Sequence, residues 1–201
     1  MAEPSAQRDS VIIRPVANED ELDMVHHLTH DNYVAMGYAS PQPNRKLAHY
    51  GDFDHLIETT ILVAIRDNEV IGSASVTMDG PWGLTVDKDF KRICDMLRYN
   101  GRSLAVIWRL VIAKSAGPSL KILMGLIQQV TNRALMEGVN TALITVNPKH
   151  QTVYQRLVNA TVLSTNNFTK GLDQAPGVLL RMDYENLPAS WKTLAPNGQA
   201  A

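Results

Sequence analysis

The chain has 201 residues, of which 45% are apolar and 19% charged, and its formal net charge at pH 7 is −1. This composition is that of an ordinary globular protein and excludes a fibrous or disordered chain. The balanced charge argues against a long nucleic-acid footprint, which would need a basic patch or stripe. No apolar run reaches the roughly 18 to 20 residues of a membrane span, and Met1–Ser10 is too polar for a secretory signal. We therefore expect a cytoplasmic protein without a membrane span.

The first half of the chain predicts a strand, a helix and a hairpin. Residues 11–16 form a short β-branched run that includes Pro15, which indicates a first strand. Asn18, followed by three acidic residues, is typical of a helix start, and the helical spacing of apolar residues continues to about Met36. Residues 38–58 show no regular pattern. Two apolar runs at 60–65 and 70–76 flank Asp67–Glu69 and predict an antiparallel hairpin.

The second half alternates helices with strands. We expect helices at 87–98, 119–137 and 151–157, and strands at 104–113, 141–146, 161–165 and 177–184. Together with the first half, this order predicts an α/β protein of the α+β type. Its mixed, mostly antiparallel central sheet would carry helices on both faces. We expect one domain over residues 11–184, with flexible ends at 1–10 and 185–201.

A candidate anion site lies where the strand over 104–113 meets the long helix. The turn between them reads Lys114-Ser-Ala-Gly-Pro-Ser119, so its side chains are mostly small. The first N–H groups of a helix have no partner within the helix, and its dipole is positive there. Such a turn can hold a phosphate group.

The turn is similar to the Arg/Gln-x-x-Gly-x-Gly/Ala signature of GNAT acyltransferases. After the next strand come Asn147-Pro-Lys-His150 and then Tyr154, which resemble the second signature of that superfamily. Within it, the chain resembles bacterial N-acyl amino acid synthases, which are related to acyl-homoserine lactone synthases. The likeness covers residues 11–184 and rests on the segments Tyr33–Tyr38, Asp52–Asp54, Gly72, 87–98, Gly101-Arg102, Arg109-Leu110 and Asn147–His150.

The resemblance implies a GNAT fold in which two strands splay apart around an acyl thioester. The donor would be an acyl carrier protein or acyl-coenzyme A, both of which carry phosphopantetheine, and the acceptor would be the amine of an amino acid or similar small molecule. No permanently bound cofactor and no metal are expected. The implied catalytic residues are His150, Tyr154 and Arg109. The donor-binding residues would be Leu110, Val111, Ile112, Lys114, Ala116, Gly117, Ser119 and Asn147. The residues expected to contact the acceptor or the acyl chain are Tyr33, Asp52, Asp54, Trp82 and Val106.

Two positions leave alternatives open. The synthases usually carry a glutamate three residues before the arginine, where this chain has Val106. The protein could therefore be an N-acyl amino acid synthase, an acetyl-coenzyme A-dependent acetyltransferase, or an acyl-binding domain without catalysis. Arg109 in an apolar strand needs a carboxylate or an open cleft. Asp52 or Asp54 could either pair with it or hold the acceptor amine.

Overall fold

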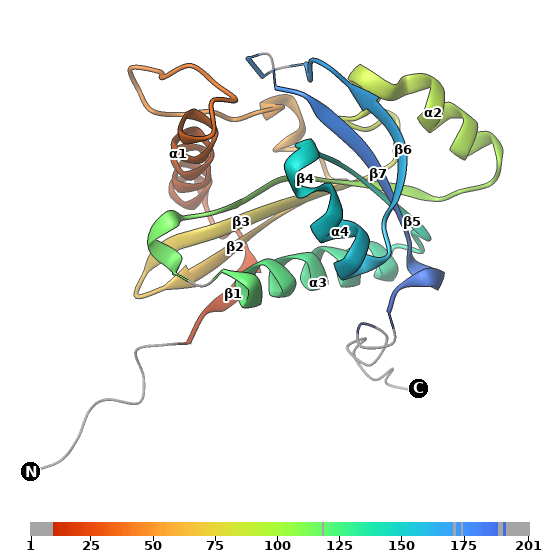
Figure 1. Cartoon of the computed structure of the whole chain (residues 1–201). Helices are drawn as coiled ribbons and strands as arrows, with labels where there is room; N and C mark the ends of the chain where they lie inside the picture. Colours follow the sequence, from red (N-terminus) through yellow and green to blue (C-terminus); the bar gives the residue numbers. More distant parts are fainter. Residues whose placement is uncertain (1–9, 118, 171, 174, 189–190, 192–201) are drawn as a thin grey trace, which may run out of the picture.

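The computed structural model describes residues 10–117, 119–170, 172–173, 175–188 and 191. Seven strands of this described part form a sheet in the order β1–β2–β3–β4–β5–β7–β6 (Figure 1). All neighbouring strands are antiparallel except β4 and β5, which are parallel. The strands are β1 (Ile12–Pro15), β2 (Thr59–Arg66), β3 (Glu69–Met78), β4 (Leu104–Ile112), β5 (Thr141–Val146), β6 (Thr161–Asn166) and β7 (Gly177–Asp183).

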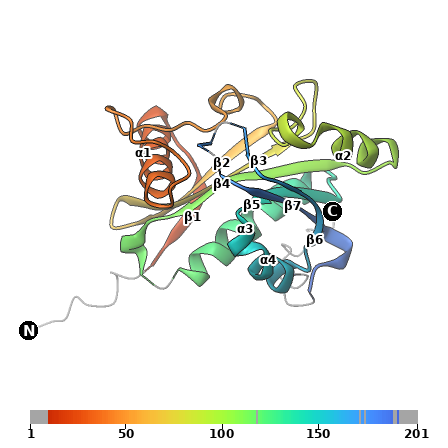
Figure 2. The ribbon, with the colours of Figure 1, turned by 45° about the horizontal axis from the view of Figure 1, so that its top comes forward.

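Helices cover both faces of the sheet, as Figures 1 and 2 show. They are α1 (Glu19–Ala35), α2 (Asp87–Tyr99), α3 (Leu120–Met136) and α4 (Gln151–Val158). On one face α1 and α2 pack over separate apolar clusters, and on the other α3 and α4 share the largest cluster. The predicted mixed sheet with helices on both faces is confirmed.

Local sequence explains most element ends. The side chain of Asn18 accepts a hydrogen bond from the backbone N–H of Glu21 at the start of α1, as an N-cap residue does. Between β2 and β3 the chain turns through Asp67 and Asn68, both with positive φ (52° and 63°), which suits a tight hairpin. Glu69, expected in this turn, is already part of β3.

The C-terminal segment is not wholly separate from the core. Leu187 and Trp191 are 7% and 8% exposed and belong to the cluster beneath α3, because large apolar side chains there gain by leaving water. The expectation of a loose tail therefore fails at these two residues. Residues 1–9 and 192–201 lie outside the described part of the chain. No described helix is long and apolar enough to cross a membrane.

The sheet opens between β4 and β5. Their pairing ends at Ile107 and Ile144, although β4 continues to Ile112 and β5 to Val146. A β-bulge shifts the register of β4 against β3 at this point, and Arg109 there has φ 50°. A bulge bends its strand and increases the local twist. The last five residues of β4 thus leave β5, as the sequence resemblance implied.

Candidate functional site

A cavity of about 430 Å³ occupies the gap between β4 and β5. Its walls include Ile107 and Leu123 from the α3/α4 side of the sheet and Val106 and Trp108 from the α1/α2 side. The cavity therefore reaches both faces of the sheet. Its size falls within the range of ligand pockets for small organic molecules.

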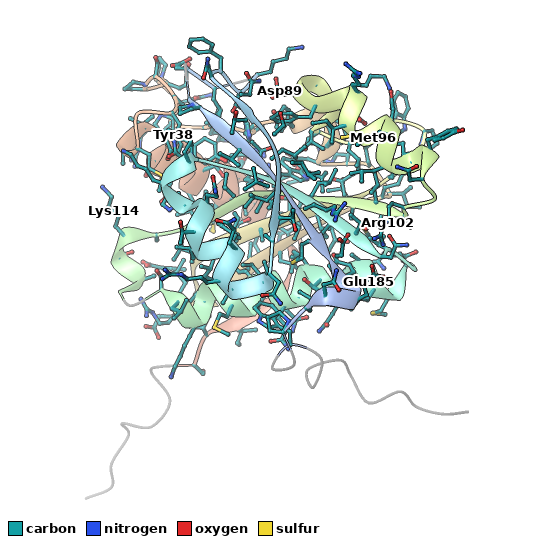
Figure 3. The ribbon with its side chains drawn as sticks, turned by 45° about the vertical axis from the view of Figure 1, so that its right-hand side comes forward. Tyr38, Asp89, Met96, Arg102, Lys114 and Glu185 are labelled. Carbon is teal, nitrogen blue, oxygen red and sulfur yellow. The ribbon has the colours of Figure 1, made fainter. Side chains whose placement is uncertain are left out.

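The start of α3 lies at one end of the cavity. Ser119 lines it, and the preceding Gly117 has φ 73° and ψ −146°, a conformation that residues with a Cβ rarely adopt. Lys114 is exposed in the turn Lys114–Ala116 and points outward at the edge of the molecule (Figure 3). Ala116 is buried in the core below.

The segment after β5 forms a second wall. The Asn147 side chain accepts a hydrogen bond from the Lys149 backbone N–H (3.1 Å) and caps the turn Pro148–His150 that leads into α4. Asn147, His150 and Tyr154 all line the cavity. Burial raises the pKa of Tyr154 to about 12, so its hydroxyl stays protonated and can donate a hydrogen bond.

Arg109 is held by a carboxylate beneath the α1/α2 face. It is 2% exposed, and its guanidinium contacts both oxygens of Asp54, at 2.7 and 3.2 Å. His26 of α1 lies 2.9 Å from the same carboxylate. Burial alone would raise the pKa of Asp54, but the hydrogen bonds with His26 and Arg109 hold it below its usual value. Asp54 thus braces Arg109, one of the two alternatives that the sequence left open.

Val106 stands on an apolar part of the wall. Its side chain is 0% exposed and packs in one cluster with Trp108, Leu143 and Leu179. The Trp108 indole N–H donates to the hydroxyl of Thr77 (3.0 Å) rather than to the cavity. No proton acceptor therefore comes from these wall positions.

Described residues of the connection between β6 and β7 border the cavity near α1 and α2. The Lys170 backbone N–H donates to the carboxylate of Asp89 (3.1 Å), and its carbonyl accepts from the hydroxyl of Tyr50 (3.0 Å). The backbone N–H of Asp173 donates to the carbonyl of Tyr38 (2.8 Å). In Figure 3, Tyr38 and Asp89 lie at this end of the molecule. Thr169 and Leu172 of this connection line the cavity, as does Tyr50.

The structure brings together most of the residues predicted from the sequence. The cavity is lined by His150, Tyr154, Arg109, Leu110, Val111, Ile112, Ser119, Asn147, Tyr33 and Val106. Lys114, Ala116, Gly117, Asp54 and Asp52 are not part of its lining, although Gly117 precedes the helix start and Asp54 holds Arg109. Trp82 is 72% exposed and outside the cavity, so the structure does not support its predicted contact with substrate.

Sequence reasoning missed several lining residues. They include His49, Tyr50, Thr85, Asp89 and Thr169. His49 and Tyr50 lie in the segment without periodicity, and both have positive φ (44° and 71°), which no residue type there signalled. Among the described residues, no group of three or more His, Cys, Asp or Glu side chains could hold a metal ion.

Comparisons with known proteins identify the family and the fold to which this cavity belongs. Residues 24–183 match the model of a family described as N-acyl amino acid synthase FeeM. The solved FeeM synthase from uncultured soil microbes shares 20% identity at a TM-score of 0.77, over 92% of this chain and 95% of that one. No curated protein matches the chain.

Two more distant structures share the fold. A coenzyme A-dependent acyl-homoserine lactone synthase, BjaI, solved with S-adenosylmethionine (SAM) and isopentyl-CoA, has a TM-score of 0.61 at 12% identity, covering 92% of this chain and 88% of that one. A GNAT-family acetyltransferase from Streptococcus pneumoniae has a TM-score of 0.56 at 12% identity, covering 87% and 99%. The splayed sheet around the cavity is therefore a GNAT fold.

Proposed function

Because the chain belongs to the FeeM family of N-acyl amino acid synthases and is thus an acyltransferase, we propose that it transfers a long acyl group from a phosphopantetheine thioester to the amine of an amino acid. The family resemblance drawn from the sequence is confirmed by the match over residues 24–183. The observation that carries the proposal is the cavity of about 430 Å³ that passes between β4 and β5. It gives a thioester and an amine access to one point from opposite faces of the sheet.

The donor occupies the α3/α4 side in this proposal. The turn Lys114–Gly117 and Ser119 at the start of α3 face the phosphates, where free helix N–H groups favour an anion. The pantetheine arm runs along Leu110–Ile112 of β4 and past Asn147. Coenzyme A and acyl carrier protein share this arm, and the related BjaI was solved with isopentyl-CoA. Lys114 is exposed and can meet the outer phosphates.

The thioester then lies beside α4. The protonated Tyr154 hydroxyl faces the sulfur and stabilises it as it leaves, and His150 contacts the thioester from the start of α4. Backbone N–H groups of β4 beyond Ile107, where pairing with β5 has ended, polarise the carbonyl. Preorganised donors of this kind lower the barrier because they need no reorganisation during the reaction.

The acceptor and the acyl chain share the remaining volume. Tyr33, Met36, Tyr38 and Trp108 line the α1/α2 side, and this aromatic and apolar wall suits a chain longer than acetyl. Arg109 lies among them with its charge matched by Asp54. Because this pairing offsets the charge of Arg109, the amino acid as acceptor is inferred from the family match and not from the charge of the cavity.

Mass spectrometry of reaction mixtures tests this proposal. The purified protein would be incubated with twenty amino acids and, in separate reactions, acetyl-, octanoyl- and dodecanoyl-coenzyme A or dodecanoyl acyl carrier protein. We expect an N-acyl amino acid and one equivalent of free thiol from a long-chain donor, and far less product from acetyl-coenzyme A. Thiol release that does not depend on the amino acid, or amide formed only with acetyl, would contradict the proposal.

A further inference from the structure

His49 is held in a strained and enclosed position at the α1/α2 side of the cavity. It lines the cavity, and its ring lies between those of Tyr33 (5.3 Å between centroids) and Tyr50 (4.2 Å). Both His49 and Tyr50 have left-handed backbone angles, with φ 44° and 71°. Consecutive non-glycine residues in this region cost free energy, and such strain concentrates at functional sites.

The imidazole of His49 has an unused nitrogen. Its Nδ1 is buried and has no hydrogen-bond partner among the described residues, whereas buried polar atoms are nearly always bonded. Burial, followed by the charges of Arg109 and Lys88, lowers the pKa of His49 to about 3. The ring is therefore neutral at physiological pH, and a neutral imidazole always offers one nitrogen lone pair as an acceptor.

The carboxylates on this side are hydrogen-bonded within the protein. Asp54 is bonded to Arg109 and His26, and Asp89 accepts the backbone N–H of Lys170. The side chain of Val106 has no polar atom. His150 lies apart from this group, at the start of α4, with its side chain exposed. His49 is the cavity residue with a buried side-chain nitrogen that lacks a hydrogen-bond partner among the described residues.

We propose that His49 is the catalytic proton acceptor for the amine in the N-acyl transfer, an inference that rests on the proposed function. The amine nitrogen attacks the thioester carbonyl, so that the C–N bond forms and the C–S bond breaks. The nitrogen gives up one proton to the imidazole of His49, which is too weak a base to keep it and releases it within the same turnover. The departing thiolate takes up one proton and leaves as a thiol. The step needs no further reactant, and the neutral ring is restored after each turnover.

Two substitutions at this position test the role. His49→Asn keeps a residue that tolerates the left-handed backbone, and His49→Gly removes the side chain and relieves the strain. We expect kcat to fall about 100-fold or more in both, the usual contribution of a positioned base, with donor affinity unchanged. Added imidazole should restore turnover of His49→Gly by about tenfold or more, because a free base can occupy the vacated space.

The matched control is His55→Asn, since His55 is exposed and lines no part of the cavity. It should keep the wild-type kcat. The inference is overturned if His49→Asn keeps its kcat while folded, or if imidazole rescues His150→Gly and not His49→Gly. Circular dichroism confirms the fold of each variant. If the wild-type protein forms no amide, the proposed function itself is wrong. This outcome is distinct from a failure of the role proposed for His49.

Discussion

Arg109 and Asp54 form a buried ion pair on which the α1/α2 side of the cavity depends. Their side chains are 0% and 2% exposed, and the nearest N–O distance is 2.7 Å. Arg109 also donates to the carbonyl of Ala48 and the hydroxyl of Ser75, so the pair joins β3 and β4 to the loop that carries His49. Removing one partner would leave the other charge buried without compensation.

We therefore predict that Asp54→Asn lowers the free energy of unfolding by about 3 kcal/mol, a typical cost of breaking a buried pair. Because the pKa of Asp54 is held below its usual value, the pair stabilises the fold above about pH 4 and loses this effect as the pH falls through the lowered pKa. The difference in the free energy of unfolding between wild type and variant should therefore become smaller as the pH falls below about 4. Urea denaturation at several pH values measures it.

Asp52→Asn is the control for this loss. Asp52 is exposed two residues earlier in the same segment, and such surface changes usually stay within about 0.5 kcal/mol. An equal destabilisation by both substitutions would mean that the loss is not specific to the pair.

At the scale of elements, the start of α3 depends on the backbone of Gly117. Its φ is 73°, and a Cβ at this position would meet nothing within 4 Å. A side chain at this position would therefore not clash with its surroundings. It would disturb the turn because a β-branched residue avoids this positive φ. A shift of this turn moves the N–H groups that are proposed to face the donor phosphates.

We predict that Gly117→Val raises the dissociation constant of the acyl-coenzyme A donor about tenfold, equivalent to about 1.4 kcal/mol, as measured by isothermal titration calorimetry. Gly138→Val is the matched control: its φ is 72°, it is equally open, and it follows the opposite end of α3. Both variants should lose similar stability, but only the first should lose donor affinity. If the two variants bind the donor with equal affinity, the donor phosphates do not bind at this turn.

The regular elements around the cavity could be predicted from the sequence, but the irregular ones could not. The ends of α3, β4 and β5 were predicted to within one residue because apolar periodicity and Gly138 define them. The positions of His49 and Asp89 could not be predicted, since they depend on an irregular loop and on the packing of α2 against the sheet. Likewise the spacing of Asp52 and Asp54 did not reveal which one meets Arg109, as a loop without a repeat has no defined face.

At the scale of the whole molecule, the cavity that reaches both faces of the sheet bears on the order of chemical events. Two substrates that enter from opposite faces can be bound at the same time. The acyl group can then pass directly from donor to acceptor without a covalent acyl-enzyme intermediate. Cys94, the only cysteine in the sequence, is 0% exposed and outside the cavity lining. Burial and the nearby Asp87 raise the pKa of its thiol to about 12, and a thiol without thiolate character is a poor nucleophile.

We therefore predict direct transfer in a ternary complex, and initial rates measured with both substrates varied should give intersecting double-reciprocal lines. Parallel lines would reveal a covalent acyl-enzyme instead. Cys94→Ala should leave this pattern and kcat unchanged to within about twofold, because the thiol serves packing beneath α2. A burst of free thiol before any amino acid is added, detected by stopped-flow absorbance, would contradict direct transfer and require a nucleophile within the cavity.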